Sequence, residues 1–281
     1  EWFEKRRGMA NAILGVAVSF GFSYSPRVLD RLIQAGGWQG AWRFLALIIG
    51  GGFCVFAFLF FRDKPEDFDR EPDGGTVKTR RLLHPETEAG KNFGLKEARR
   101  TFSYWVFILA LTTASLIVTA FTFHVVSIFA EAGLSRSRAV AIFFPSSIVA
   151  VSVQFLASWS SDYLKIKYLL ALQIGGMALL ALGIVLLSPG LPVVLVVLGN
   201  GITQGLMGVT NNITWVRFFG RKHLGAVSGF AAAWTVAGSA AGPYLFSLSL
   251  DIAGSYAFIG MISLGIIGAL FVAAFKADRP E

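Results

Sequence analysis

Eight long apolar segments, separated by short polar breaks, make up most of the chain. Each is close to the roughly 20 residues that a helix needs to cross a bilayer, and few charges fall inside them. The segments lie at residues 9–26, 42–61, 103–130, 139–159, 168–188, 191–216, 224–250 and 254–275. The pattern predicts an all-α, polytopic membrane protein with eight transmembrane helices.

Composition favours the same class. Hydrophobic residues make up 54% and charged residues 15% of the 281 residues, whereas a soluble domain of this length would spread more charge over its surface. The net charge of +8 is concentrated in short islands that cap the apolar segments. Positive-inside asymmetry therefore explains it better than nucleic-acid binding does. The single cysteine, Cys54, excludes an intrachain disulfide.

One long polar run interrupts the apolar pattern. Residues 62–100 hold ten Lys or Arg and nine Asp or Glu, and such a run cannot bury enough apolar surface to fold alone. We therefore expect a solvated connector between two segments on one side and six on the other. Near its end, Leu95 and Ala98 share a helix face, which predicts a short helix along the membrane surface.

The distribution of Lys and Arg predicts the orientation. If the eight segments alternate across the membrane, 20 of the 25 Lys and Arg lie on the side that holds both termini and the connector. Cytoplasmic loops carry such an excess. Both termini are therefore expected in the cytoplasm.

The first and seventh segments form an internal repeat. The sequence FEKRRGMA from Phe3 matches FGRKHLGA from Phe219, and Pro26 matches Pro243 at nearly the same offset. Both copies run in the same direction and lie six segments apart, as in transporters built from two parallel six-helix repeats. The first two segments would then be the fifth and sixth of twelve helices, and four further helices are expected to precede them.

The chain resembles the major facilitator superfamily over essentially its full length. The sequence WFEKRRGMANAILG followed by GGWQGAWRFLALIIGG resembles the fifth and sixth helices of that family. FHVVSIFAEAGLS and ITWVRFFGRKHLGAVSG are similar to the monocarboxylate and oxalate/formate branch. ASWSSDYLKIK resembles the second copy of the family's cytoplasmic loop motif, with Asp162, Lys165 and Lys167 in place and Ser158 where a glycine is expected.

This resemblance implies a division of the chain into three parts. Residues 1–61 would be the last two helices of the N-terminal bundle, and residues 62–102 the cytoplasmic linker between the bundles. Residues 103–281 would be the complete C-terminal six-helix bundle. The expected location is a bacterial inner (plasma) membrane.

Amide side chains form a polar stripe on segment 191–216. Asn200, Gln204 and Asn211 fall within about 40° of one another on a helix, and the resemblance makes this segment the cavity-lining tenth helix. Amides offer both donors and acceptors to a polar or anionic solute, so we expect them to bind substrate. The alternative is that they cross-link helices, as is common in membrane bundles. Trp234, on segment 224–250, is a further candidate for the cavity wall, with simple packing as its alternative.

Segment 103–130, which resembles the cavity-lining seventh helix, carries Thr113 and His124 on one stripe. Both are candidate solute contacts. His124 is the only titratable side chain well inside any of the eight segments, and a histidine gains and loses a proton near neutral pH. It is therefore the candidate for proton coupling. The alternative is a neutral histidine that is hydrogen-bonded to a neighbouring helix.

Charged residues at the ends of segments suggest a cytoplasmic gate. The resemblance pairs Asp162 with Arg221 and Lys222, and assigns Arg6 to the corresponding gate of the first half. The alternative is a set of ordinary solvated helix caps. Glycine pairs at 201 and 205 and at 238 and 242 predict close helix contacts.

The resemblance implies a secondary active transporter that moves a small solute by alternating access. The expected solute is an organic anion such as a monocarboxylate, with proton coupling as one mechanism. Relatives that handle carboxylates often carry an Arg or Lys inside the eighth or eleventh helix, and segments 139–159 and 224–250 contain neither. Sugars and drugs therefore stay open as solutes, as do symport and antiport.

A non-transporting receptor or an intramembrane enzyme on the same scaffold is the remaining alternative. No P-loop, no G-x-S-x-G and no H-E-x-x-H motif occurs in the sequence, and its three histidines are scattered. We therefore expect no enzymatic activity, no cofactor and no metal. The expected partners are the solute, protons and the lipid bilayer.

Overall fold

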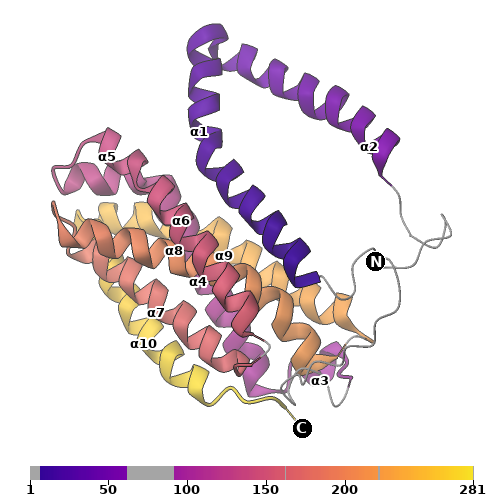
Figure 1. Cartoon of the computed structure of the whole chain (residues 1–281). Coiled ribbons are helices and arrows are strands. Elements are labelled where there is room, and N and C mark those ends of the chain that lie inside the picture. The colour runs from indigo at the N-terminus through magenta and orange to yellow at the C-terminus, as the bar shows by residue number, and fades with distance from the viewer. Residues whose placement is uncertain (1–6, 62–91, 162, 221, 281) are drawn as a thin grey trace. The chain divides into compact units, whose positions relative to one another are not determined.

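The computed structural model describes residues 7–61, 92–161, 163–220 and 222–280 (Figure 1). Every secondary-structure element in these residues is a helix. The elements are α1 (Arg7–Ala46), the π-helix η1 (Leu47–Phe53), α2 (Cys54–Phe60), α3 (Leu95–Ala98), α4 (Phe102–Glu131), α5 (Arg136–Ala141), α6 (Phe143–Ser160), α7 (Ile166–Val185), α8 (Leu191–Phe219), α9 (Leu224–Ala253) and α10 (Tyr256–Phe275).

The helices confirm a polytopic membrane protein. Within the described residues, seven helical stretches are long and apolar enough to cross a membrane. Each overlaps one of the predicted segments from 42–61 onward, although the first stretch, Arg31–Phe60, begins eleven residues earlier than predicted. The remaining predicted segment, 9–26, forms part of helix α1. It is not among the seven stretches that meet the length and hydropathy expected of a membrane span.

The chain divides into two compact units, residues 1–80 and 81–281. In the first unit, α1 continues past residue 26 and bends at Gly37, where φ is 70° and ψ is 172°. Glycine adopts this backbone conformation without the steric penalty that a side chain would add. The prediction that the first helix ends at residue 26 is therefore wrong. The helix continues through Pro26, since membrane helices tolerate proline where neighbouring groups compensate for the lost hydrogen bond.

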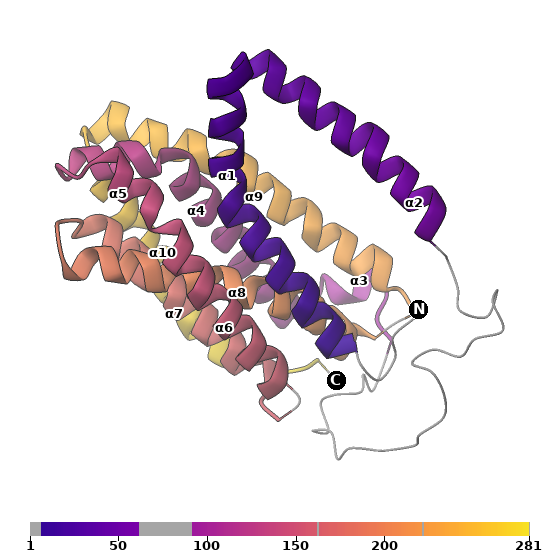
Figure 2. The ribbon, with the colours of Figure 1, turned by 45° about the horizontal axis from the view of Figure 1, so that its top comes forward.

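The second unit is a bundle in which α8 lies between α6 and α7 (Figure 2). α10 packs mainly on α7, and α9 packs mainly on α4. Among the described residues, the six largest fully buried side chains are aromatic: Tyr104, Phe107, Phe121, Phe129, Phe219 and Phe246.

Two glycines explain how closely the helices approach. A Cβ atom on Gly205 of α8 would lie 2.4 Å from the Ala150 carbonyl oxygen of α6. A Cβ atom on Gly242 of α9 would lie 2.4 Å from the Leu116 carbonyl oxygen of α4. Gly201 and Gly238 make similarly tight approaches to α6 and α4. The predicted close contacts at both glycine pairs are confirmed.

Residues 92–101 belong to the second unit and pack on its helix bundle where α8 turns into α9. The Phe93 backbone N–H donates to the Phe219 carbonyl over 2.9 Å, and their rings meet edge to face. The single turn α3 follows, with Ala98 fully buried and Leu95 packed on the same core. The predicted helix is thus present with Leu95 and Ala98 on one packed face, and its place along the membrane surface stays a prediction.

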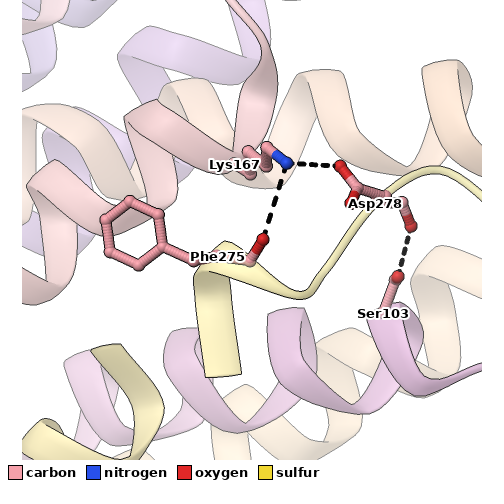
Figure 3. Close-up of polar contacts among 4 residues, drawn as sticks. All are labelled: Ser103, Lys167, Phe275 and Asp278. Carbon is pink, nitrogen blue, oxygen red and sulfur yellow. Dashed lines mark hydrogen bonds and ion pairs between the residues drawn. The ribbon is translucent and has the colours of Figure 1, made fainter. Parts of the chain in front are cut away.

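The C-terminal tail ties three helices together at the same end of the bundle (Figure 3). Lys167 Nζ, at the start of α7, lies 2.5 Å from Asp278 Oδ1 and donates to the Phe275 carbonyl of α10 over 3.5 Å. The Ser103 hydroxyl, at the start of α4, donates to the Asp278 carbonyl. We call this end, with residues 92–101 and the tail, the linker end. The opposite end, with Glu131 and Ser255, is the far end.

Candidate functional site

Two amides of the α8 stripe, Asn200 and Gln204, form a hydrogen-bonded pair in which one donor group has no partner. Asn200, about a third of the way along the 29-residue helix, is fully buried. Its Oδ1 atom accepts from Gln204 Nε2 over 3.0 Å. The Asn200 Nδ2 atom is buried and has no hydrogen-bond partner. A buried amide N–H without an acceptor is unfavourable by about 1–3 kcal/mol, so the pair is prepared to accept a further polar group.

The pair lies on the face of α8 between its contacts with α6 and with α7. Thr210 points to α7, where its hydroxyl donates to Gln173 Oε1 over 2.7 Å, while Gly205 points to α6. By the 100° helical repeat, Asn200 and Gln204 fall between these two directions. Gln204 is only half-buried, so this face is open beside it.

Asn211 continues the stripe toward the linker end. It is exposed, and its Oδ1 atom accepts from the Trp215 indole N–H over 3.1 Å. The Trp215 ring is buried against Tyr104 and Phe219. The aromatic core thereby fixes one end of the Asn211 amide.

Gln173 is an amide that the sequence analysis did not select. It is fully buried on α7, and its Nε2 atom has no partner while its Oε1 atom binds Thr210. The sequence signal was available, since Gln173 is the only Asn or Gln in segment 168–188. A polar side chain inside the membrane is a candidate functional group, and this holds for Gln173 on α7 as it does for Asn200 on α8.

His124 connects three helices through both ring nitrogens. Its Nε2 atom lies 3.0 Å from the Pro243 carbonyl oxygen of α9, and its Nδ1 atom lies 3.0 Å from the Tyr256 hydroxyl of α10. A carbonyl only accepts, so Nε2 carries the proton. In the neutral ring, Nδ1 then accepts from Tyr256. The Phe246 ring stacks beside the imidazole, and Ser127 interacts with the Tyr256 hydroxyl.

Thr113 faces the same side of α4 as His124. It lines an apolar crevice between α4, α9 and α10. None of the described contacts of Thr113 or His124 reaches the α8 amides. The structure thus places these two candidates on the α9–α10 side of α4, apart from the stripe.

Trp234 belongs to an aromatic wall near the linker end. Trp234 is 39% exposed, and the centroid of its ring lies 5.9 Å from that of Trp105 and 6.5 Å from that of Phe230. The Arg99 guanidinium lies 4.9 Å over the Phe230 ring, a favourable cation–π arrangement. Trp234 is therefore held in place on one side and open on the other.

Most of the predicted gate lies outside the described residues, namely Arg6, Asp162 and Arg221. The fourth member, Lys222, is exposed, and its backbone N–H donates to Asn92 Oδ1 over 3.2 Å. The contact ties the α8–α9 turn to the end of the linker.

Arg217 is a buried cation one residue beyond the predicted segment 191–216. It lies in the last turn of α8, is 8% exposed, and its Nη1 atom donates to the Ser161 carbonyl over 2.6 Å. A cation also suits the negative end of the helix dipole. Arg217 joins α8 to the α6–α7 turn, next to position 162.

The comparisons with known proteins agree with this architecture. The family model of the Major Facilitator Superfamily matches residues 1–243. A comparison with curated proteins gave no match. The matched region contains α8 with its amides, His124 and the α6–α7 turn. The chain belongs to the Major Facilitator Superfamily, a family of membrane transporters.

Proposed function

We propose that this protein is a secondary transporter that moves a small organic anion, such as a monocarboxylate, by alternating access. The family match supports transport. The internal repeat supports an arrangement in which α1 to α2 complete one six-helix bundle with four preceding helices, and α4 to α10 form the other. The concentration of Lys and Arg supports cytoplasmic termini in a bacterial inner membrane.

The observation that carries the choice of solute is the unpartnered Nδ2 donor of Asn200. A carboxylate accepts hydrogen bonds and donates none. Binding of a carboxylate beside Gln204 would satisfy this donor without creating a new unpaired group. Asn200 is fully buried, so the proposal requires α8 or its neighbours to move before the solute reaches it. Alternating access supplies such a movement.

The neutral donors of these helices limit the charge that the solute can carry. α6 and α9 contain no Lys or Arg, so in these helices an anion would meet amides and hydroxyls rather than a cation. Because an isolated charge inside the membrane is unfavourable, we propose a solute with one carboxylate, balanced by a co-transported proton or by a charge on the preceding helices. The similarity to the monocarboxylate and oxalate/formate branch supports the same class.

We propose His124 as the proton carrier. In the neutral state Tyr256 donates to Nδ1. Protonation turns Nδ1 into a donor, so the Tyr256 hydroxyl must rotate and donate elsewhere, with Ser127 beside it. One proton would thus reverse a hydrogen bond between α4 and α10 and change how these helices are held.

Uptake by the full-length protein in proteoliposomes tests the proposal. Labelled lactate, pyruvate, formate and oxalate would be offered with and without an inward proton gradient. We expect uptake of at least one monocarboxylate and stimulation by the gradient. Folded protein that takes up none of the four overturns the solute, and uptake of a sugar or a drug would replace it. Absence of any uptake would favour a receptor or an intramembrane enzyme.

A further inference from the structure

We propose that the crevice between α9 and α10 is a binding site for the acyl chain of a membrane phospholipid. Its volume is about 350 Å³, and α4 forms its floor. The inference rests on the membrane location of the helices and is independent of which solute is transported.

The crevice exists because two consecutive helices follow different partners. α9 and α10 are fastened together at their far end, where the Ser249 hydroxyl donates to the Ser255 carbonyl over 2.7 Å and accepts from the Ile259 N–H over 3.2 Å. Beyond this turn, α9 packs on α4 while α10 packs on α7. The two helices therefore separate and leave a space that opens outward.

The walls of this space are almost entirely hydrocarbon. Leu245 and Leu248 line it from α9, and Phe258 and Ile262 line it from α10. The polar groups in its lining are three hydroxyls, of which the one on Ser249 already makes two hydrogen bonds. A water molecule in a cavity needs two to four polar partners, and apolar cavities stay dry. Water is therefore a poor occupant.

An empty crevice is also unfavourable. Atoms that line a void lose their dispersion contacts, and the penalty grows with the volume of the void. The helices that form the crevice cross the hydrocarbon core of the bilayer. Ile252, Phe258 and Ile266 are exposed along its rim, so a chain can enter from the side. A lipid acyl chain is the molecule at this depth whose chemistry matches the walls.

Photolabelling tests the site in the protein reconstituted into bilayers. The probe is a phospholipid with a diazirine in the middle of one acyl chain, and labelled residues are mapped by mass spectrometry. Labelling at Leu248 and Ile262 should exceed that at Leu172 and Leu182, which are exposed on α7, by at least about twofold, because a chain held on three sides keeps more dispersion contacts. Equal labelling overturns the proposal. Protection of the crevice together with a dimer in native mass spectrometry overturns it in favour of a second copy.

A filling variant provides the matched control. Ser263→Phe adds a ring at the nearly buried back of the crevice, and Met261→Phe adds the same ring on α10 at a site that is 55% exposed and outside the crevice. Labelling of Leu248 should fall to the α7 level in Ser263→Phe and stay unchanged in Met261→Phe. If Ser263→Phe folds poorly, Ile266→Phe at the rim replaces it. Undiminished labelling in a folded filling variant overturns the site.

Discussion

The Nδ1 atom of His124 lies 3.0 Å from the hydroxyl oxygen of Tyr256, and this contact joins α4 to α10 in the far half of the second unit. The other ring nitrogen binds the Pro243 carbonyl of α9. One imidazole thus holds three helices with no unused hydrogen-bonding atom in its neutral form. This geometry fits both a structural role and the proposed proton-carrying role, and coupling measurements separate the two.

Substitution of His124 is expected to abolish stimulation of uptake by a proton gradient. His124→Gln keeps a polar side chain but cannot carry a proton. Tyr256→Phe keeps the histidine and removes the donor to Nδ1, which should reduce stability by about 1–3 kcal/mol and weaken the stimulation. Proteoliposome uptake with and without the gradient measures the first effect, and thermal unfolding measures the second.

Tyr244→Phe is the control for this comparison, because Tyr244 is exposed on α9. It should behave as wild type in both assays. If folded His124→Gln protein keeps its full stimulation, His124 has only the structural role.

Gly205→Ala is expected to destabilise the bundle. The new Cβ atom would lie 2.4 Å from the Ala150 carbonyl oxygen, so α6 and α8 must move apart. Overpacking of this kind typically costs about 1–3 kcal/mol. Gly208→Ala on the same helix has nothing within 4 Å of its new Cβ atom. Its unfolding midpoint should equal or exceed that of wild type, and equal midpoints for both variants would show that the helices are not in tight contact.

Asn92 is expected to protect the backbone amide of Lys222, in the α8–α9 turn, from hydrogen exchange. Its Oδ1 atom accepts from the Lys222 N–H, and Gly220 beside it has a φ of +82° and no room for a Cβ atom. Asn92→Ala should speed hydrogen exchange at the Lys222 amide by about fivefold, since one hydrogen bond contributes roughly 1 kcal/mol. Asn92→Asp keeps the acceptor and should exchange as wild type does. Equal exchange in Asn92→Ala and wild type would count against this anchor.

Loss of the Arg217 guanidinium is expected to lower both stability and uptake. Arg217→Met keeps the apolar part of the side chain and leaves the Ser161 carbonyl without its donor. We expect the free energy of unfolding to fall by about 1–3 kcal/mol. We also expect slower uptake, because the α6–α7 turn loses its hydrogen bond to α8. Lys276→Met removes the same charge from an exposed site at the end of α10 and should leave both properties unchanged. The reverse ranking of the two variants would rule out a role for the contact.

Hydrophobic patterning predicts much of this fold because the length of a membrane helix is set by the bilayer. The predicted segment 103–130 differs from α4 by one residue at each end. Gly37 was not recognised as the bend, because a proline at residue 26 is the stronger sequence signal for a helix end and membrane helices tolerate it. The burial of Ala98 depends on tertiary packing, and a four-residue helix has no periodicity of its own to reveal it.

The candidate site was less accessible to prediction. The 100° repeat placed Asn200 and Gln204 on one stripe, and the structure shows them bonded to each other. The same repeat could not reveal that His124 faces α9 and α10, because periodicity specifies a face but not the helix that covers it. The predicted segment 191–216 ends just before Arg217 because charges usually mark the ends of membrane helices, whereas the last turn of α8 buries this charge.

The most direct test of the proposed transport site compares uptake of a labelled monocarboxylate by wild-type, Asn200→Ala and Asn212→Ala full-length protein. Asn212 is an exposed neighbour on α8 that lies off the stripe. Asn200→Ala removes both the unpartnered Nδ2 donor and the Oδ1 acceptor of Gln204. Because these two losses act on stability in opposite directions, we expect it to unfold near the wild-type temperature. It should nevertheless require about tenfold more solute for half-maximal uptake, as expected for a lost hydrogen bond to a charged group. Asn212→Ala should transport as wild type does. Equal uptake by all three proteins would contradict the assignment of the α8 amides to the solute site.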